Sequence, residues 1–130
     1  MILNGRMIAR QIHKQLTQRI QQLPSTPGLG IVVLGNRPDS RVYVSMKQKA
    51  CQQIGIRHRT ITLPEETSEQ VLMNHIEQLN RCPDIHGIMV QLPLPKHIES
   101  DRILNKVNHK KDIDGFHVDN VGNLTLNSKT

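Results

Sequence analysis

Three short segments of the sequence carry side chains that could act together on a small molecule. Tyr43 and Lys47 are four residues apart, so on a helix they share one face. Gln91 is a lone amide between an apolar run and the sequence Leu-Pro-Leu-Pro. Asp112 and Asp114 precede a glycine in the sequence Lys-Asp-Ile-Asp-Gly. A phenol, an amine, an amide and a carboxylate can bind a polar heterocycle and move protons.

Gln91 marks the point where the chain leaves a strand. Residues 86–90 are mostly apolar and predict a buried strand, whereas the two prolines that follow cannot donate to a sheet ladder. In open α/β sheets, ligands bind outside the carboxyl ends of the strands. The segment that begins at Gln91 is therefore expected to form one wall of a pocket.

The helical pair and the acidic turn each allow a simpler interpretation. Lys47 could be a surface lysine whose stem packs on Tyr43, and the acids could form a turn exposed to solvent. As functional groups, Lys47 would be an acid or base and Tyr43 a flat platform. A carboxylate at Asp112 or Asp114 would accept two parallel hydrogen bonds from an N–H pair, such as guanine or a pterin presents.

The order of predicted elements indicates an α/β fold, with a small, mostly parallel sheet flanked by helices in three layers. Apolar residues at four-residue intervals predict a helix over residues 5–23. A second helix is expected from Pro38 to residue 54, and Thr67 with Gln70 forms a capping box for a third that runs to Asn80. Strands are expected at 28–35, 57–63 and 86–90, and a short helix at 98–107.

Composition limits the class of protein without deciding it. The 130 residues fit one domain, and the charge of +6 fits an acidic ligand, nucleic acid or a simply basic surface. Cys51 and Cys82 have no metal-ligand spacing, so we expect free thiols in a reducing, cytoplasmic compartment. The seven histidines form no metal set, the sequence contains no signal peptide or membrane span, and Gly28-Leu29-Gly30 lacks the third glycine of a dinucleotide fingerprint.

The motifs together resemble the bifunctional methylenetetrahydrofolate dehydrogenase/methenyltetrahydrofolate cyclohydrolase family. The similarity rests on residues 2–9, 35–47, 87–95 and 111–117, in this order. It implies that the lysine is the principal catalytic residue, that the glutamine supports it, that the tyrosine lies over the folate and that the second aspartate holds the pterin. The implied catalytic residues are Lys47, Tyr43 and Gln91, and the implied substrate-binding residues are these three with Leu92, Pro93 and Asp114.

The same resemblance implies a function in folate one-carbon metabolism, which supplies purine and amino-acid biosynthesis. Family members oxidise 5,10-methylenetetrahydrofolate with NADP⁺ and hydrolyse the methenyl product to 10-formyltetrahydrofolate, without a metal. Because NADP is bound mainly by a second, Rossmann-type domain that 130 residues cannot include, we expect residues 1–122 to be the N-terminal, folate-binding catalytic domain. Residues 123–130 would then begin a linker. The isolated chain is expected to lack dehydrogenase turnover, and the full-length enzyme to be a homodimer.

Two other functions remain open at this point. A folate-binding or interaction domain without turnover would keep the same pocket residues. A basic nucleic-acid-binding module would use the positive charge, but aromatic residues make up only 2% of the chain and single-strand binders stack bases on such residues. We therefore expect a small-molecule folate partner, and neither a nucleic acid nor a membrane.

Overall fold

The computed structural model describes residues 5–115, in which helices and strands alternate as the sequence predicts. Several ends differ by a few residues from the predicted ones; the first helix, for example, ends at Gln21 and the last begins at Ser100. In chain order the elements are α1 (Gly5–Gln21), β1 (Gly28–Leu34), α2 (Pro38–Ile54), β2 (Arg57–Leu63), α3 (Glu69–Arg81), β3 (Gly87–Val90) and α4 (Ser100–Lys106).

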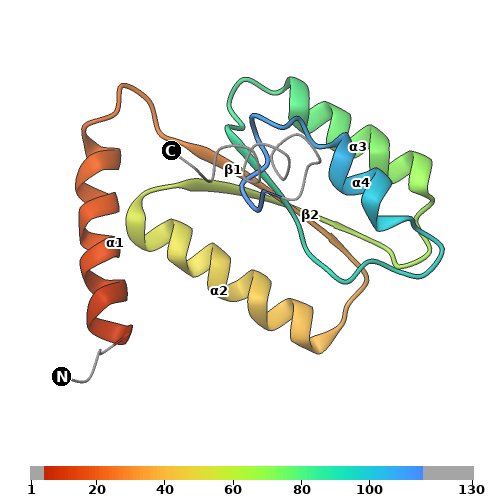
Figure 1. The fold of residues 1–130 in the computed structure, drawn as a ribbon, viewed down its shortest axis with the longest axis horizontal. Coiled ribbons are helices and arrows are strands. Elements are labelled where there is room, and N and C mark those ends of the chain that lie inside the picture. The colour runs from red at the N-terminus through yellow and green to blue at the C-terminus, as the bar shows by residue number, and fades with distance from the viewer. Residues whose placement is uncertain (1–4, 116–130) are drawn as a thin grey trace, which may run out of the picture.

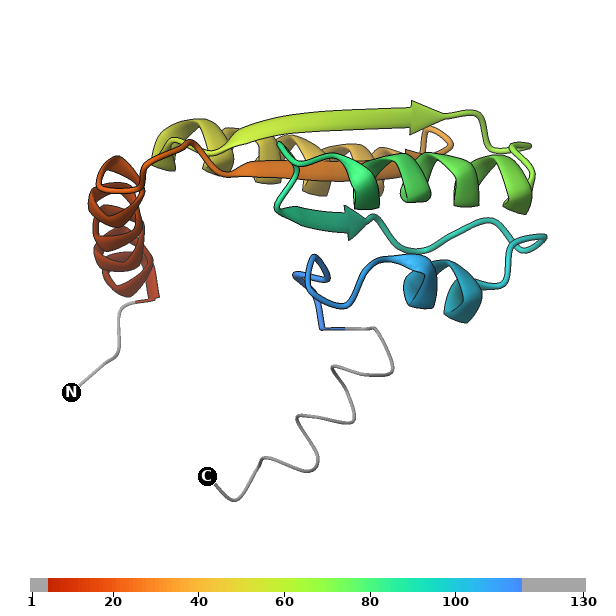
Figure 2. The ribbon, with the colours of Figure 1, turned by 90° about the horizontal axis from the view of Figure 1, so that it is seen from above.

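The three strands form a parallel sheet in the order β2-β1-β3, with β1 in the centre. Helix α2 covers one face of this sheet, and α3 and α4 cover the other (Figures 1 and 2). The prediction of a parallel, three-layered α/β fold is therefore confirmed. Because all strands run the same way, their carboxyl ends meet at one edge of the sheet. At this edge the chain passes from β1 to α2, passes from β2 to α3, and leaves β3.

Strand β1 supplies side chains to both faces of the sheet, because successive residues of a strand point to opposite sides. Val32 and Leu34 pack with buried residues of α3 and α4, whereas Ile31 and Val33 pack with Val44 on α2. Burying one such side chain contributes roughly 1.5–3 kcal/mol. The aliphatic core thus fixes α2 on one side of β1 and the α3–α4 pair on the other.

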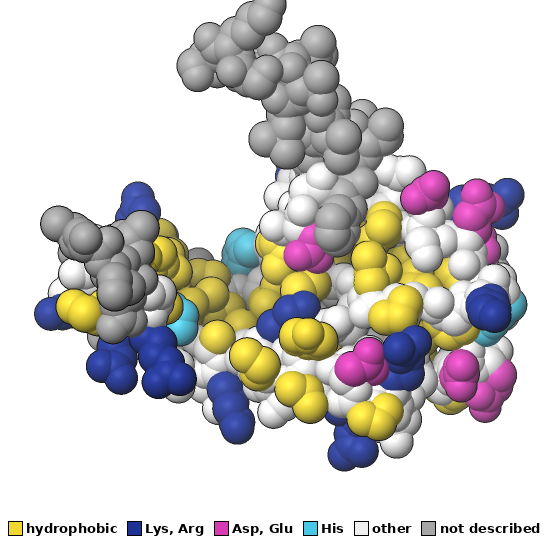
Figure 3. Space-filling view, turned by 60° about the horizontal axis from the view of Figure 1, so that its bottom comes forward, with side chains coloured by type: hydrophobic (Ala, Val, Ile, Leu, Met, Phe, Trp, Pro, Cys, Tyr) yellow, Lys and Arg dark blue, Asp and Glu magenta, His cyan; other side chains and the backbone are white. Residues whose placement is uncertain are grey.

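Helix α1 stands apart from this core, although its sequence is amphipathic. The helix has no buried residue, and Ile8, Ile12 and Leu16 on its apolar stripe are all exposed. Its main contacts are with α2, and a hollow with apolar side chains lies beside it (Figure 3). The sequence pattern predicted the helix correctly but not how little of its apolar face the described residues cover.

The start of α3 corrects one sequence prediction. The N-cap residue is Ser68, whose hydroxyl oxygen accepts a hydrogen bond from Val71 N at 3.2 Å. Thr67, the predicted cap, instead donates its backbone N–H to Pro64 O in the preceding turn. Both residues carry a hydroxyl group that can cap a helix, and the turn before α3 places Ser68 at the cap position.

The predicted domain boundary after residue 122, the linker at 123–130 and the family-like residues Phe116 and His117 lie outside the described residues. No helix in the described part of the chain is long and apolar enough to cross a membrane. The remaining prediction for this region, the acidic turn, is described as far as Gly115 and forms part of the site below.

Candidate active site

The side chains of Lys47 and Gln91 meet at the carboxyl edge of the sheet. Lys47 Nζ donates a hydrogen bond to Gln91 Oε1 at 2.9 Å, and both residues are partly buried. Helix α2 brings the amine to this edge because its residue Val44 is packed on the β1 face beside it. The predicted meeting of the lysine and the glutamine is a feature of the structure.

The strand exit fixes the orientation of the Gln91 amide. Gln91 N still bonds to Val32 O at 2.8 Å, so the backbone leaves the sheet only after this residue. On the side chain, Nε2 donates to Leu92 O at 3.1 Å, which leaves Oε1 to accept from Lys47. The Leu92–Pro93 peptide bond is cis. Gln91 therefore presents an acceptor to the amine without bringing a negative charge.

Asp114 lies within electrostatic range of the same amine. Its pKa is raised above the usual value because neighbouring atoms displace water from the carboxyl group, and the nearby Asp112 adds to this rise, whereas the positive charge of Lys47 opposes it. The residue is otherwise exposed, so the carboxyl remains open to a ligand. Three segments far apart in the sequence thus contribute an amine, an amide and a carboxyl to one edge of the sheet.

The other predicted site residues lie around these three. Tyr43 is one helical turn before Lys47 on α2 and is 56% exposed, so its ring is available as a platform. Leu92 is partly buried and Pro93 is exposed in the segment that leaves β3. All six predicted residues fall within the described part of the chain; their roles in binding or catalysis remain predictions.

The acidic turn is attached to β3 in a way that the sequence did not predict. Ile88 N donates to Lys111 O at 2.7 Å, and Ile88 forms a parallel bridge with Asp112. Gly87 permits this approach: a Cβ at this position would lie 2.6 Å from Ile113 Cγ2. The turn therefore lies against the edge of β3. In the sequence, the lysine just before the two acids is the residue that could have indicated this attachment.

Gly28 and Gly30 do not form the phosphate-binding turn of a dinucleotide fingerprint. Gly28 and Gly30 lie inside β1, where an added Cβ would meet Asp84 O and the Leu79 side chain, respectively. Among residues 5–115, no group of three or more His, Cys, Asp or Glu side chains could hold a metal ion. Both cysteines are free thiols, and burial raises the pKa of Cys51.

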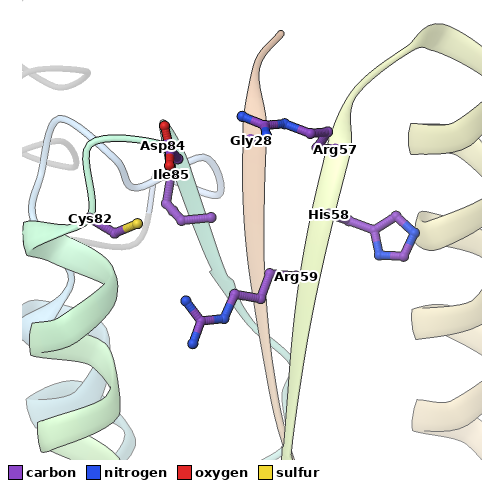
Figure 4. Close-up of a pocket in the computed structure, with 7 residues that line it drawn as sticks. All are labelled: Gly28, Arg57, His58, Arg59, Cys82, Asp84 and Ile85. Atoms are coloured by element: carbon purple, nitrogen blue, oxygen red, sulfur yellow. The ribbon is translucent and has the colours of Figure 1, made fainter.

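A second hollow, of about 250 Å³, lies at the opposite edge of the sheet, near the amino ends of β1 and β2 (Figure 4). Arg59 points to the same side as Cys82 and Ile85, whereas His58 points toward the other face. None of the residues that line this hollow is a predicted site residue. Its residues are Gly28, Arg57, His58, Arg59, Cys82, Asp84 and Ile85.

The fold and the site together define a class of α/β domain in which a helix-borne lysine meets a strand-end glutamine beside an acidic turn. Comparison with known proteins gives this class a name. The model of the tetrahydrofolate dehydrogenase/cyclohydrolase catalytic domain matches residues 3–114. The chain belongs to this family, as the resemblance in the sequence predicted.

Known relatives are similar over nearly the whole chain. The bifunctional protein FolD 2 of Arabidopsis thaliana is 42% identical over 132 residues, which cover 98% of this chain and 44% of that protein. The crystal structure of the bifunctional FolD methylenetetrahydrofolate dehydrogenase/cyclohydrolase from Campylobacter jejuni superposes with a TM-score of 0.92 at 39% identity, covering 94% of this chain and 44% of that one.

A third relative was solved with ligands. The Trypanosoma brucei methylenetetrahydrofolate dehydrogenase-cyclohydrolase, complexed with NADP and an inhibitor, superposes with a TM-score of 0.92 at 33% identity. The match covers 100% of this chain and 46% of that one. The present chain therefore spans less than half the length of the relatives that it matches.

Proposed function

We propose that this chain is the folate-binding catalytic domain of a methylenetetrahydrofolate dehydrogenase/methenyltetrahydrofolate cyclohydrolase, and that its own residues carry the hydrolytic step. The observation that supports this most directly is the hydrogen bond of 2.9 Å between Lys47 Nζ and Gln91 Oε1, beside the Asp114 carboxyl. The relatives named above are described as bifunctional FolD proteins, which agrees with this proposal.

Lys47 is the group that moves protons in this proposal. The methenyl substrate is a cation, and water must add to its one-carbon bridge before the bond from this carbon to one ring nitrogen breaks. An amine that is partly neutral can take the proton from the attacking water and return one to the leaving nitrogen. Gln91 orients this amine through a neutral acceptor, so it does not hold the amine charged.

The remaining residues bind the substrate. The Asp114 carboxylate accepts two parallel hydrogen bonds from the amino group and the neighbouring ring N–H of the pterin. Tyr43 stacks over the folate ring, and Leu92 and Pro93 form the wall where the chain leaves β3. The exposure of Tyr43 and the open carboxyl of Asp114 support these roles, because both groups are accessible from solvent.

The oxidative step requires the part of the protein that the relatives contain in addition. NADP is bound there in this proposal, which agrees with the placement of Gly28 and Gly30 inside a strand, and the isolated chain lacks dehydrogenase turnover. Residues 1–122 form the domain and 123–130 begin the linker. The full-length enzyme is a cytoplasmic homodimer whose products supply purine and amino-acid biosynthesis.

A second function deserves a test because the chain covers less than half of its relatives. The domain could bind folate, or take part in an interaction, without turnover. Binding and hydrolysis are measured separately on the 130-residue chain with 5,10-methenyltetrahydrofolate: binding by calorimetry, and hydrolysis by the loss of the methenyl absorbance. Binding with hydrolysis above the uncatalysed rate supports the catalytic domain, and binding alone supports the second function. No binding contradicts both, and NADPH formation from methylenetetrahydrofolate and NADP⁺ contradicts the expected lack of dehydrogenase turnover.

A further inference from the structure

We propose that Lys111 is a positioning residue that holds Asp114 in the candidate site by anchoring the acidic turn to the end of α3. The inference rests on the substrate-binding role proposed for Asp114. Lys111 is the first residue of the Lys-Asp-Ile-Asp-Gly motif, and neither its charge nor its place in the sequence gives it a role in the proposed chemistry. Its role follows from where its side chain and its backbone are bound.

The ammonium group of Lys111 caps the carboxyl end of α3. Lys111 Nζ donates to three backbone carbonyl oxygens, those of Leu79 at 3.0 Å, Asn80 at 2.7 Å and Cys82 at 2.9 Å. The last carbonyls of a helix lack partners within the helix and carry the negative end of its dipole. One cation that uses all three of its donors there is a strong local anchor.

The backbone of the same residue is fixed to β3 and to the preceding loop. Lys111 O accepts from Ile88 N at 2.7 Å, and Lys111 N donates to Asn108 O at 2.8 Å. The next residue, Asp112, continues the contact through its bridge with Ile88. Lys111 therefore joins α3 to β3 three residues before Asp114, a distance that even an extended chain spans in roughly 10 Å. Loss of the side-chain anchor would leave only these backbone contacts to hold the turn that carries the Asp114 carboxyl.

A separate contact keeps the earlier part of the loop in place. Asn80 Nδ2 donates to Lys106 O at 2.9 Å, and Asn80 Oδ1 accepts from Asn108 N at 2.8 Å. These bonds hold the end of α4 and residue 108 on α3 without any help from the lysine side chain. Loss of the Lys111 ammonium should therefore loosen the turn after residue 108, which keeps its backbone contacts with Ile88 and Asn108, and leave the domain folded.

The test compares Lys111→Met with Lys110→Met in the 130-residue chain. The two lysines are adjacent, but Lys110 is exposed, and its hydrogen bond to Asn108 Oδ1 is donated by its backbone N–H. Lys111→Arg keeps a cation and its donors and should restore part of the effect. Circular dichroism and thermal melting check that each variant is folded. Gln replaces Met at position 111 if the first variant does not fold.

Two readouts separate positioning from a general structural role. The first is the affinity for 5,10-methenyltetrahydrofolate, which Lys111→Met should lower by about tenfold or more, as expected when a hydrogen bond to a charged group is lost. The double variant Lys111→Met/Asp114→Asn should bind no more weakly than Asp114→Asn alone, because both changes remove the same contact. Additive losses, or a Lys110→Met variant as weak as Lys111→Met, would overturn the proposal.

The second readout needs no ligand. The carboxyl of Asp114 is titrated by NMR in the unliganded chain. In Lys111→Met its raised pKa should fall toward the ordinary value, because the released turn lets water reach the carboxyl. An unchanged titration in a folded variant contradicts the positioning role. If the unmodified chain binds no folate, the proposed function fails, and the NMR titration still decides whether Lys111 positions Asp114.

Discussion

Lys47 Nζ and Gln91 Oε1 are 2.9 Å apart although the two residues are 44 positions apart in the sequence. The bond joins the middle of α2 to the point where the chain leaves β3. It therefore depends on the packing of α2 on the sheet and on the central position of β1 between its neighbours. The proposed chemistry depends on this one contact more than on any other, so the first two predictions change its two partners.

Lys47→Met should remove the proton-transfer group while leaving the fold intact. We expect hydrolysis of methenyltetrahydrofolate to fall by roughly two to four orders of magnitude, the usual cost of losing a general acid or base. The measurement is made on an enzyme that continues through the second half found in the relatives. Lys49 is an exposed lysine two positions further along the same helix. Lys49→Met is therefore the matched control and should retain activity. Near-normal hydrolysis by Lys47→Met would remove the lysine from the mechanism.

Gln91→Glu should inactivate the enzyme through its negative charge, because the two side chains have nearly the same shape. A carboxylate in place of Oε1 would pair with the ammonium form of Lys47 and so lower the fraction of neutral amine. Because the neutral fraction rises with pH, the rate of the variant should recover as the pH is raised, with its profile displaced to higher pH than that of the unmodified enzyme. Gln91→Ala lacks the added charge and should not displace the profile; equal profiles for all three proteins would contradict this explanation.

Folate affinity should depend on the ionisation of Asp114. Only the carboxylate accepts two hydrogen bonds, and its pKa is raised by partial burial and by Asp112 against the opposing charge of Lys47. Affinity is therefore highest above this pKa and declines as the pH falls through it, beginning at a higher pH than an ordinary aspartate would give. Calorimetric titrations across the acidic range measure the decline. Asp114→Asn should bind more weakly at neutral pH and show no such decline; a variant as tight as the unmodified chain would contradict the pterin contact.

Truncation of a side chain on the buried face of α3 should destabilise the domain more than truncation on its exposed face. Leu72 is fully buried within the cluster that joins β1 to α3 and α4, so Leu72→Ala should lower the free energy of unfolding by about 2–5 kcal/mol. Val71 is the adjacent residue on the same helix and is 45% exposed, so Val71→Ala should change it by less than about 0.5 kcal/mol. Chemical denaturation of both variants gives the comparison, and similar losses would show that α3 does not carry the core as described.

The sequence by itself determined the elements and the family. Apolar periodicity, the prolines after Gln91 and the glycine after Ile54 are local signals, and each reports a backbone preference that does not depend on distant residues. The order of strands and helices then limits the fold to a parallel α/β sheet, whose carboxyl edge must gather the strand-end residues. The resemblance to a known family then pointed to Lys47, Gln91 and Asp114, whereas the residues alone also allowed a surface lysine and an exposed acidic turn.

Only the tertiary structure decided how these residues are held. The three carbonyls that bind Lys111, the choice of Ser68 over Thr67 as the cap and the exposure of the α1 stripe all depend on how separate elements pack. A side chain's partners depend on how separate elements pack in three dimensions, and local sequence patterns do not report that packing. The residue types therefore predicted the chemistry of the candidate site, whereas the contacts that hold its residues in place are seen only in the folded chain.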